Sequence, residues 1–203
     1  MKVSHIIYKV DDLSIAVESF PKKGFKVEYG SKKEPHNALI YFSEGPYIEL
    51  LHKPPISSMA IWLLRFIGQG SVASRLKKWI KADEGYIDLC FENYDDHFNI
   101  EKTILKQNHH SFFTTTSQRT DPQGRKLRWK LLFPHEKRLP FLMTYFNIDP
   151  KPQHFTHPNG IKRIKRITMG CADNMVSVIH ELCDDTILSL EIGPTSLEVE
   201  YGK

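Results

Sequence analysis

The sequence predicts an α+β protein in which one strand–helix–strand–strand–strand module occurs twice. The same order of alternating and helical apolar patterns runs over residues 3–53 and again over residues 85–146. A pair of aspartates precedes the helical pattern in each copy. A shorter third pattern follows a proline-containing stretch near residue 150. A pattern repeated in this way predicts that each copy forms one structural unit.

The first module covers residues 1–54. Residues 3–10 alternate in polarity, which predicts a strand with His5 on one face. Apolar residues at helical spacing follow Asp12, a residue type that caps helices, and Gly24 is placed to end the helix in a left-handed conformation. Three strands are then predicted over residues 25–29, 38–42 and 47–53.

Residues 55–84 form an insertion between the modules. We expect a helix over residues 59–67, capped by Ser57 or Ser58, and a second helix beginning near Ser71. The pair would cover a sheet edge or the next module. The second helix combines Trp79 with several lysines, so binding to a membrane surface is the alternative for it.

The second module covers residues 85–148, and residues 149–203 hold a linker and a shortened third unit. A strand over 86–92, a helix over 97–108 and strands over 112–116, 126–133 and 139–146 are expected in the former. A linker over residues 150–158 precedes the third unit, in which Asp173 would cap a helix between strands. This unit has no internal partner, so we expect it to extend the sheet of the second module or to pair with its copy in a homodimer.

Composition places the chain among ordinary globular proteins. Its 203 residues carry a net charge of +4, and 40% are hydrophobic. The three cysteines are widely spaced, which predicts reduced thiols in a cytoplasmic protein, and no signal peptide or membrane span is expected. The basic run of residues 162–166, with Lys126, Arg128 and Lys130, is the best nucleic-acid candidate. Basic strands of this kind are usually solvated edges, so we expect neither a nucleic-acid nor a membrane partner.

Several short segments together carry a family resemblance. They are residues 5–13, 24–25, 37–40, 47–51, 119–124, 127–129, 139–142 and 157–160. In this order and spacing they resemble the bacterial glyoxalase-like domain proteins of the vicinal oxygen chelate superfamily, which includes glyoxalase I, bleomycin resistance proteins and extradiol dioxygenases. The resemblance implies that two modules pair their sheets into a curved cup. It also implies a divalent metal held by residues of the first and last strands of each module.

Strand parity selects three candidate metal ligands. His5 and Glu49 should face the cup, because their neighbours Ile6, Ile48 and Leu50 are apolar and should face the helix. Asp88 has the same parity in the second module, whereas the position that matches Glu49 falls near Phe141, which is no ligand. Histidine and carboxylates suit zinc, iron, manganese or nickel. A plain His5–Glu49 contact in a metal-free cup is the alternative.

Four further residues are candidates for substrate binding. Arg119 could hold an anionic group of a ligand, or it could form a surface pair with Asp121. Asn37 could aim its amide into the cup or shape the preceding loop. Trp129 is expected to be a wall of the cup or part of the core.

Two functions follow as hypotheses. The first is a metal-assisted lyase, isomerase or dioxygenase that acts on a small oxygenated molecule in the cup. The second is a metal-free protein that binds or sequesters a small molecule, as resistance proteins of the superfamily do. The sequence identifies neither the substrate nor a catalytic residue.

Overall fold

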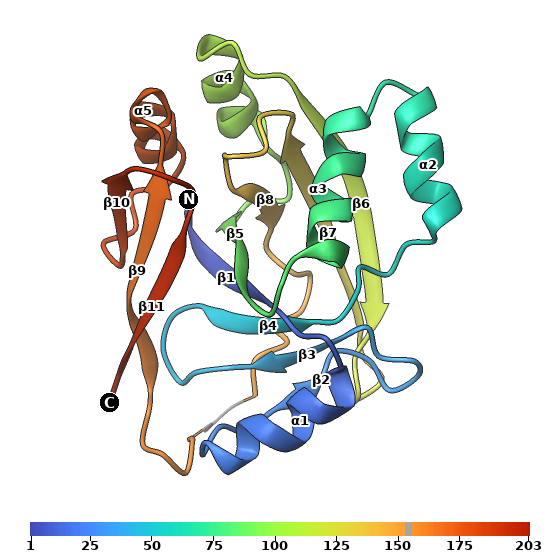
Figure 1. Cartoon of the computed structure of the whole chain (residues 1–203), viewed down its shortest axis with the longest axis vertical. Coiled ribbons are helices and arrows are strands. Elements are labelled where there is room, and N and C mark those ends of the chain that lie inside the picture. Colours follow the sequence, from blue (N-terminus) through green and yellow to red (C-terminus); the bar gives the residue numbers. More distant parts are fainter. Residues whose placement is uncertain (153–155) are drawn as a thin grey trace.

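Eight strands form one curled, mixed sheet, and a separate sheet of three strands packs against it (Figure 1). The computed structural model describes residues 1–152 and 156–203, so residues 153–155 of the predicted linker lie outside the described part. The strand order of the large sheet is β2-β3-β4-β1-β5-β8-β7-β6. Its strands are β1 (Lys2–Lys9), β2 (Glu28–Tyr29), β3 (Asn37–Ile40), β4 (Tyr47–Leu51), β5 (Gly85–Asn93), β6 (Phe112–Thr120), β7 (Lys126–Pro134) and β8 (Phe141–Thr144).

The large sheet contains two copies of one strand arrangement. β1 runs parallel to β4, and β5 runs parallel to β8 in the same way. β1 and β5 pair antiparallel at the centre, where they join the two modules. The remaining strands of each module follow outward in the same order. The predicted fold class, α+β with paired modules in a curved mixed sheet, is therefore confirmed.

Within residues 1–152 and 156–203, five helices accompany the strands. They are α1 (Leu13–Lys22), α2 (Ser58–Phe66), α3 (Gly70–Lys81), α4 (Asn99–Gln107) and α5 (Asp173–Leu182). The Asp12 carboxylate accepts hydrogen bonds from the first free backbone N–H groups of α1, as its position predicted. Ser57 caps α2 through a bond from the Ala60 N–H. None of the described helices is both long enough and apolar enough to cross a membrane.

Three helices differ from the prediction in their start or in their cap. α4 begins at Asn99, several residues after the aspartate pair, because Asn93 binds the His97 carbonyl and keeps the chain non-helical up to that point. α3 begins at Gly70 and its cap position makes no side-chain hydrogen bond, so Ser71 lies inside the helix. Asp173 is the first residue of α5, where a carboxylate still interacts favourably with the helix dipole.

Gly24, after α1, provides a test of the loop that leads into the rest of the first module. Its φ is +81°, and an added Cβ would lie 2.7 Å from Asn159 Cβ. We expect Gly24→Ala to lower the free energy of unfolding by about 1–3 kcal/mol, from backbone strain plus this contact. Gly45→Ala is the matched control, because Gly45 also has a positive φ but an added Cβ there meets nothing. Urea denaturation should show the smaller loss for the control, and equal losses would contradict the Asn159 contact.

Two hydrophobic clusters lie on opposite faces of the large sheet. The first joins the outward-facing side chains, such as Ile6, Ile48 and Leu50, to helices α1, α4 and α5. The second joins inward-facing residues, such as Ile7 and Met143, to helices α2 and α3. The α2–α3 hairpin therefore lies against the concave face, which is the inside of the cup.

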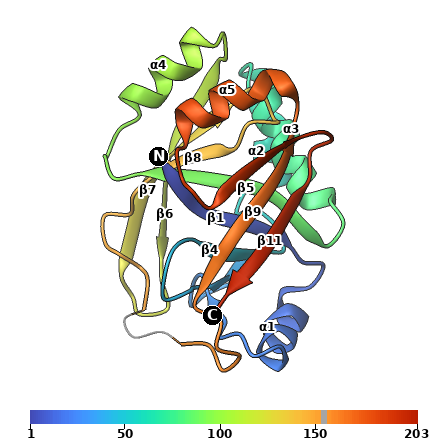
Figure 2. The ribbon, with the colours of Figure 1, turned by 90° about the vertical axis from the view of Figure 1, so that its left-hand side faces the viewer.

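The third unit forms its own sheet of β10 (Leu188–Ile192), β9 (Arg163–Cys171) and β11 (Leu197–Gly202). The expectation that it extends the sheet of the second module is wrong. The apolar face of β9, which includes Ile164 and Ile167, is buried in the outer hydrophobic cluster instead. In Figure 2 this sheet crosses over β1 and β5. A hydrogen bond of 2.6 Å between the Tyr86 and Tyr201 hydroxyls joins the two sheets.

Candidate functional site

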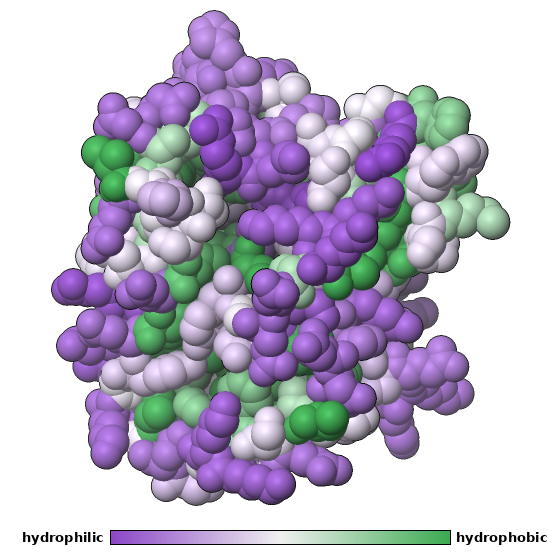
Figure 3. All heavy atoms as spheres, viewed as in Figure 1, coloured by the Kyte–Doolittle hydropathy of each residue, from purple (hydrophilic) through white to green (hydrophobic). Residues whose placement is uncertain are grey.

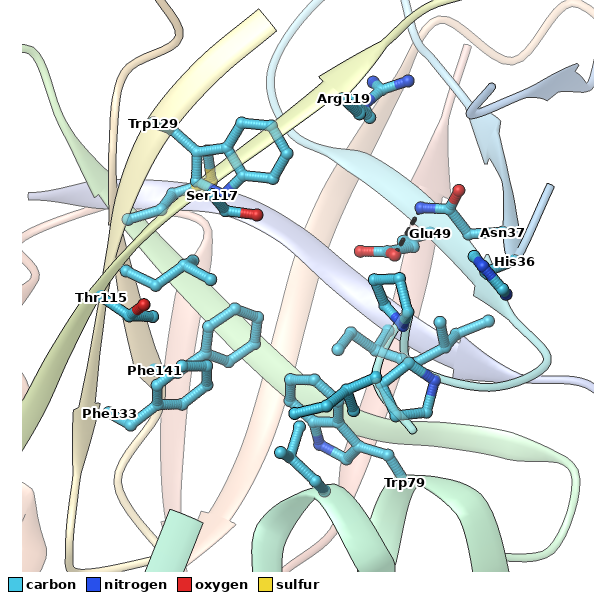
Figure 4. Close-up of a pocket in the computed structure, with 18 of the residues that line it drawn as sticks. His36, Asn37, Glu49, Trp79, Thr115, Ser117, Arg119, Trp129, Phe133 and Phe141 are labelled. Carbon is cyan, nitrogen blue, oxygen red and sulfur yellow. Dashed lines mark hydrogen bonds between the residues drawn. The ribbon is translucent and has the colours of Figure 1, made fainter. Parts of the chain in front are cut away.

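A cavity of about 480 Å³ lies inside the cup, between the concave face of the sheet and the α2–α3 hairpin (Figure 4). Most of its wall is apolar, and β1, β4, β6, β7, β8 and α3 all contribute side chains. Trp129, Ser117 and Thr115 lie on one side, and Glu49 and Asn37 lie on the other. A cavity of this size and character suits a small organic molecule.

His5 and Glu49 meet at one wall of this cavity. They project from the neighbouring parallel strands β1 and β4, and His5 Nε2 lies 3.4 Å from Glu49 Oε2. The Tyr47 ring stacks on the imidazole with 4.8 Å between centroids, and the Phe141 ring meets it edge-on. Ile48 and Leu50, on either side of Glu49, point into the outer core. The alternation of side chains along β4 thus places Glu49 inside the cup, as the sequence indicated.

Hydrogen bonds behind His5 define which of its nitrogens carries the proton. Ser4 Oγ lies 2.8 Å from Glu92 Oε2 and 3.1 Å from His5 Nδ1. A hydroxyl has one proton to donate, and the Glu92 carboxylate is a stronger acceptor than the alternative Met143 sulfur at 3.3 Å. With that proton donated to Glu92, Ser4 Oγ is an acceptor for the Nδ1–H tautomer of His5. In this tautomer the lone pair on Nε2 faces Glu49.

Burial shifts the pKa values of His5 and Glu49 so that the neutral form of each side chain is favoured. Burial, helped by the nearby Arg119 guanidinium, lowers the pKa of His5 to about 3. Burial also raises the pKa of Glu49, while a hydrogen bond from Asn37 and the charge of Arg119 oppose this rise. His5 is therefore a neutral imidazole near pH 7. Its lone pair and the Glu49 oxygen are two acceptors that need a proton or a cation between them.

Asn37 and Arg119 complete the polar part of the wall. Asn37 Nδ2 donates to Glu49 Oε1 at 2.6 Å, which orients the carboxylate (Figure 4). Arg119 lines the cavity from β6 and donates to the Gly30 carbonyl. β6 extends four residues beyond its predicted end, so Arg119 is part of this strand rather than of a turn. The cavity thus offers a cation near the His5–Glu49 pair.

The structure does not bring Asp88 to the other two candidate ligands. Its carboxylate accepts hydrogen bonds from Trp79 Nε1 at 2.7 Å and from Arg75 at 3.2 Å. It also accepts the Leu89 backbone N–H at 2.9 Å. These contacts hold α3 against β5, so Asp88 has a structural partner set of its own.

Two other sequence candidates occupy different environments. Asp121 is buried in the β6–β7 turn and pairs with Arg125 at 2.6 Å, rather than with Arg119. Trp129 lines the cavity and packs against Phe146, with 5.0 Å between centroids. Phe141 stacks on Phe133 in the cavity wall, where the second module was expected to lack a ligand.

Sequence analysis missed several residues of the site. His36, Thr115 and Ser117 also line the cavity. The last two alternate with exposed residues along β6, so a longer predicted strand would have placed them on the face of Arg119. Ser4 and Glu92, which orient His5, carry no local signal because their contacts join residues 88 positions apart. Within the described residues, no group of three or more His, Cys, Asp or Glu side chains is arranged to hold a metal.

The curled sheet of paired modules, with a cavity on its concave face, defines a protein of the vicinal oxygen chelate superfamily. Residues 3–183 match the family model described as a glyoxalase-like domain, so the chain belongs to this family. The comparison with curated proteins finds no match.

One solved structure shows the same fold at low sequence identity. The Mn(II)-bound glyoxalase from Novosphingobium aromaticivorans superposes with a TM-score of 0.57 at 10% identity, over 98% of this chain. The chain spans 64% of the length of that structure. A glyoxalase I mutant from Zea mays has a TM-score of 0.41 at 13% identity, over 88% of this chain and 53% of its own.

Proposed function

We propose that the cup binds a small, largely apolar molecule with oxygen atoms, and that His5 and Glu49 hold a divalent metal beside it. One observation carries this proposal. The lone pair of His5 Nε2 and the Glu49 Oε2 atom face each other at 3.4 Å inside a buried cavity. Two acceptors in this arrangement repel each other unless a cation or a proton lies between them.

The separation of the two atoms suits a shared metal ion. Two ligands that are each about 2.1 Å from one tetrahedral ion lie about 3.4 Å apart. An imidazole nitrogen and a carboxylate are ligands for zinc, iron, manganese or nickel. With two protein ligands, the remaining positions would be left for water or for oxygen atoms of the bound molecule. When bound, such a metal acts as a Lewis acid that polarises substrate oxygens.

The surrounding residues would prepare this site in three ways. Ser4 and Glu92 keep the Nε2 lone pair of His5 directed at the cavity. Asn37 holds one oxygen of Glu49 and leaves the other facing His5. Arg119 would bind a carboxylate or another anionic group of the substrate. Together with the apolar wall, these contacts support lyase, isomerase or dioxygenase chemistry on a small oxygenated molecule.

A metal-free binding protein is the second candidate, and a specific observation favours it. Burial raises the pKa of Glu49, so a proton can take the place of the metal between the two side chains. The cup would then bind or sequester its ligand through Arg119, Trp129 and the apolar wall. The Asp88 carboxylate, which accepts hydrogen bonds from three residues, is not included in either version of the site.

The location and assembly of the chain are separate proposals. All three cysteines are free and buried, which supports a reducing, cytoplasmic environment. A homodimer stays a proposal, and light scattering at high concentration would test it.

Metal analysis of the purified protein distinguishes the two functions. We expect about one Zn, Mn, Fe or Ni ion per chain, and loss of at least about 90% of it in both His5→Ala and Glu49→Gln. His36→Ala is the matched control, because His36 lines the same cavity without facing Glu49. A metal-free wild type that binds none of these ions in calorimetry would favour the second function. Metal retained by both site variants would contradict the proposed ligands.

A further inference from the structure

Helix α2 carries a second apolar stripe that faces away from the cup. Its inner side is buried through Ile61, and Leu64 lines the cavity. Its outer side exposes Met59, Trp62, Leu63 and Phe66, followed by Ile67, and the exposed fractions of these five residues run from 49% to 73%. We call these five residues the outer face of α2. A cluster of large apolar side chains in solvent indicates a binding surface.

The side chains of the outer face are arranged as one continuous patch. Trp62 and Phe66 are one helical turn apart, and their ring centroids lie 4.1 Å from each other. Figure 3 shows the apolar surface gathered over α2, beside hydrophilic side chains of the neighbouring elements. The rest of the described chain leaves this patch open.

The segment of the chain that contains the outer face carries charge of one sign. Residues 50–82 contain six lysines and arginines and no aspartate or glutamate. Arg75 is buried against Asp88, whereas Lys53, Arg65, Lys78 and Lys81 are exposed. The hairpin therefore presents an apolar patch within a basic segment. This combination is complementary to an anionic lipid surface, whose headgroups attract basic residues while its acyl region accepts apolar ones.

A second copy of the chain fits this surface less well. In a two-fold interface the same patch lies on both partners, so the basic residues of each hairpin would approach those of the other. Like charges at an interface oppose association. Trp62 beside Arg65, with the lysines of α3 in the same hairpin, instead suits a helix that lies in a membrane interface.

We propose that the outer face of α2 docks on the surface of an anionic lipid bilayer. Trp62, Leu63 and Phe66 enter the boundary between headgroups and acyl chains, and Arg65 and the lysines of the hairpin bind the anionic headgroups. This proposal differs from the expectation of no membrane partner, whose one alternative concerned α3. The apolar stripe of α3, including Val72, Leu76 and Trp79, is buried against the sheet, so the exposed surface belongs to α2.

Vesicle binding tests this proposal on the full chain, independently of any chemistry in the cup. The protein is sedimented with vesicles of phosphatidylcholine alone or mixed with phosphatidylglycerol. We expect binding to the mixed vesicles that weakens at high salt, and little binding to phosphatidylcholine. The double variant Trp62→Ser with Phe66→Ser should lower the partition coefficient by at least about tenfold. Arg65→Gln with Lys81→Gln should lower it by about tenfold on the mixed vesicles.

A matched control separates the outer face from exposed apolar residues in general. Ile15 on α1 and Ile100 on α4 are exposed to a similar extent, at 67% and 66%. The double variant Ile15→Ser with Ile100→Ser should bind as the wild type does. Equal loss in this control, or equal binding to both kinds of vesicle, would overturn the proposal. So would a dimer in light scattering that Trp62→Ser with Phe66→Ser converts to a monomer, because the second copy would then be the occupant.

Discussion

Arg75→Met is expected to lower the free energy of unfolding by about 3–5 kcal/mol. Arg75 is the largest fully buried side chain of the described residues and lies on α3. Its guanidinium pairs with Asp88 at 3.2 Å and donates to the Leu139 carbonyl at 2.6 Å. Methionine fills a similar volume but leaves the Asp88 carboxylate buried without its charge partner. The cost is therefore that of an uncompensated buried charge, measured by urea denaturation at pH 7.

Two variants show whether the buried charge causes this loss. Arg75→Met combined with Asp88→Asn should recover part of the stability, because a neutral amide can still accept the Trp79 Nε1–H. Arg163→Met removes an exposed ion pair with Glu44 and should change the free energy of unfolding by at most about 1 kcal/mol. A loss for Arg75→Met no larger than that for Arg163→Met would contradict the structural role of the buried pair.

Asp88 shows where reasoning from strand parity reaches its limit. The alternation along β5 places Asp88 on the face opposite Leu89, which lies in the outer hydrophobic cluster. The partners that engage its carboxylate come from α3, whose position over the sheet depends on tertiary packing that no local pattern contains. The helix pair was expected to cover a sheet edge or the next module. Strand parity therefore predicts the face on which a side chain lies but not the residues that it contacts.

The strands and helices were easier to predict than their connections. Alternation and helical spacing indicated the order of elements in both modules, because each pattern extends over several residues of one element. Helix starts at aspartates and serines were less reliable, since these side chains also serve turns. The placement of the third unit was not predictable, because a strand with one apolar face can pair with several edges. In the structure, apolar residues of this unit, such as Ile164 and Ile167, pack in the outer hydrophobic cluster, and this packing determines where the unit lies.

Some contacts of the candidate site were also predictable from the sequence, and others were not. His5 and Glu49 lie two positions apart in register on neighbouring strands, since His5 pairs with Tyr47, so parity and topology together bring them close. The Asn37–Glu49 bond joins residues on adjacent antiparallel strands of the same module. The Ser4–Glu92 bond, by contrast, connects the two modules across the central strand pair. Only the three-dimensional structure gives the register of that pair.

The stability of the metal-free protein should fall steeply as the pH decreases below 6.5. Burial lowers the pKa of His5 from 6.5 to about 3 in the folded protein. The unfolded chain therefore binds this proton more tightly than the folded one does. The contribution of His5 is fully present above pH 6.5 and is lost as the pH falls toward 3, at about 1.4 kcal/mol for each pH unit. Lowering the pH from 6.5 to 5 should remove about 2 kcal/mol of the His5 contribution to the free energy of unfolding. Lowering it from 6.5 to 3 should remove about 5 kcal/mol.

Glu49 opposes this loss between its folded pKa, which is raised, and its ordinary pKa of 4.5. Its folded pKa is raised by burial, so the folded protein binds its proton more tightly than the unfolded chain does. As the pH falls, protonation of Glu49 stabilises the folded state, and the fall in stability should become shallower there. Urea denaturation in the presence of a chelator, between pH 7 and 5, measures the sum of the His5 and Glu49 contributions. His5→Gln removes the titrating group and should flatten the dependence by about 1.4 kcal/mol for each pH unit. An unchanged slope in this variant would show that His5 is not the buried neutral histidine responsible.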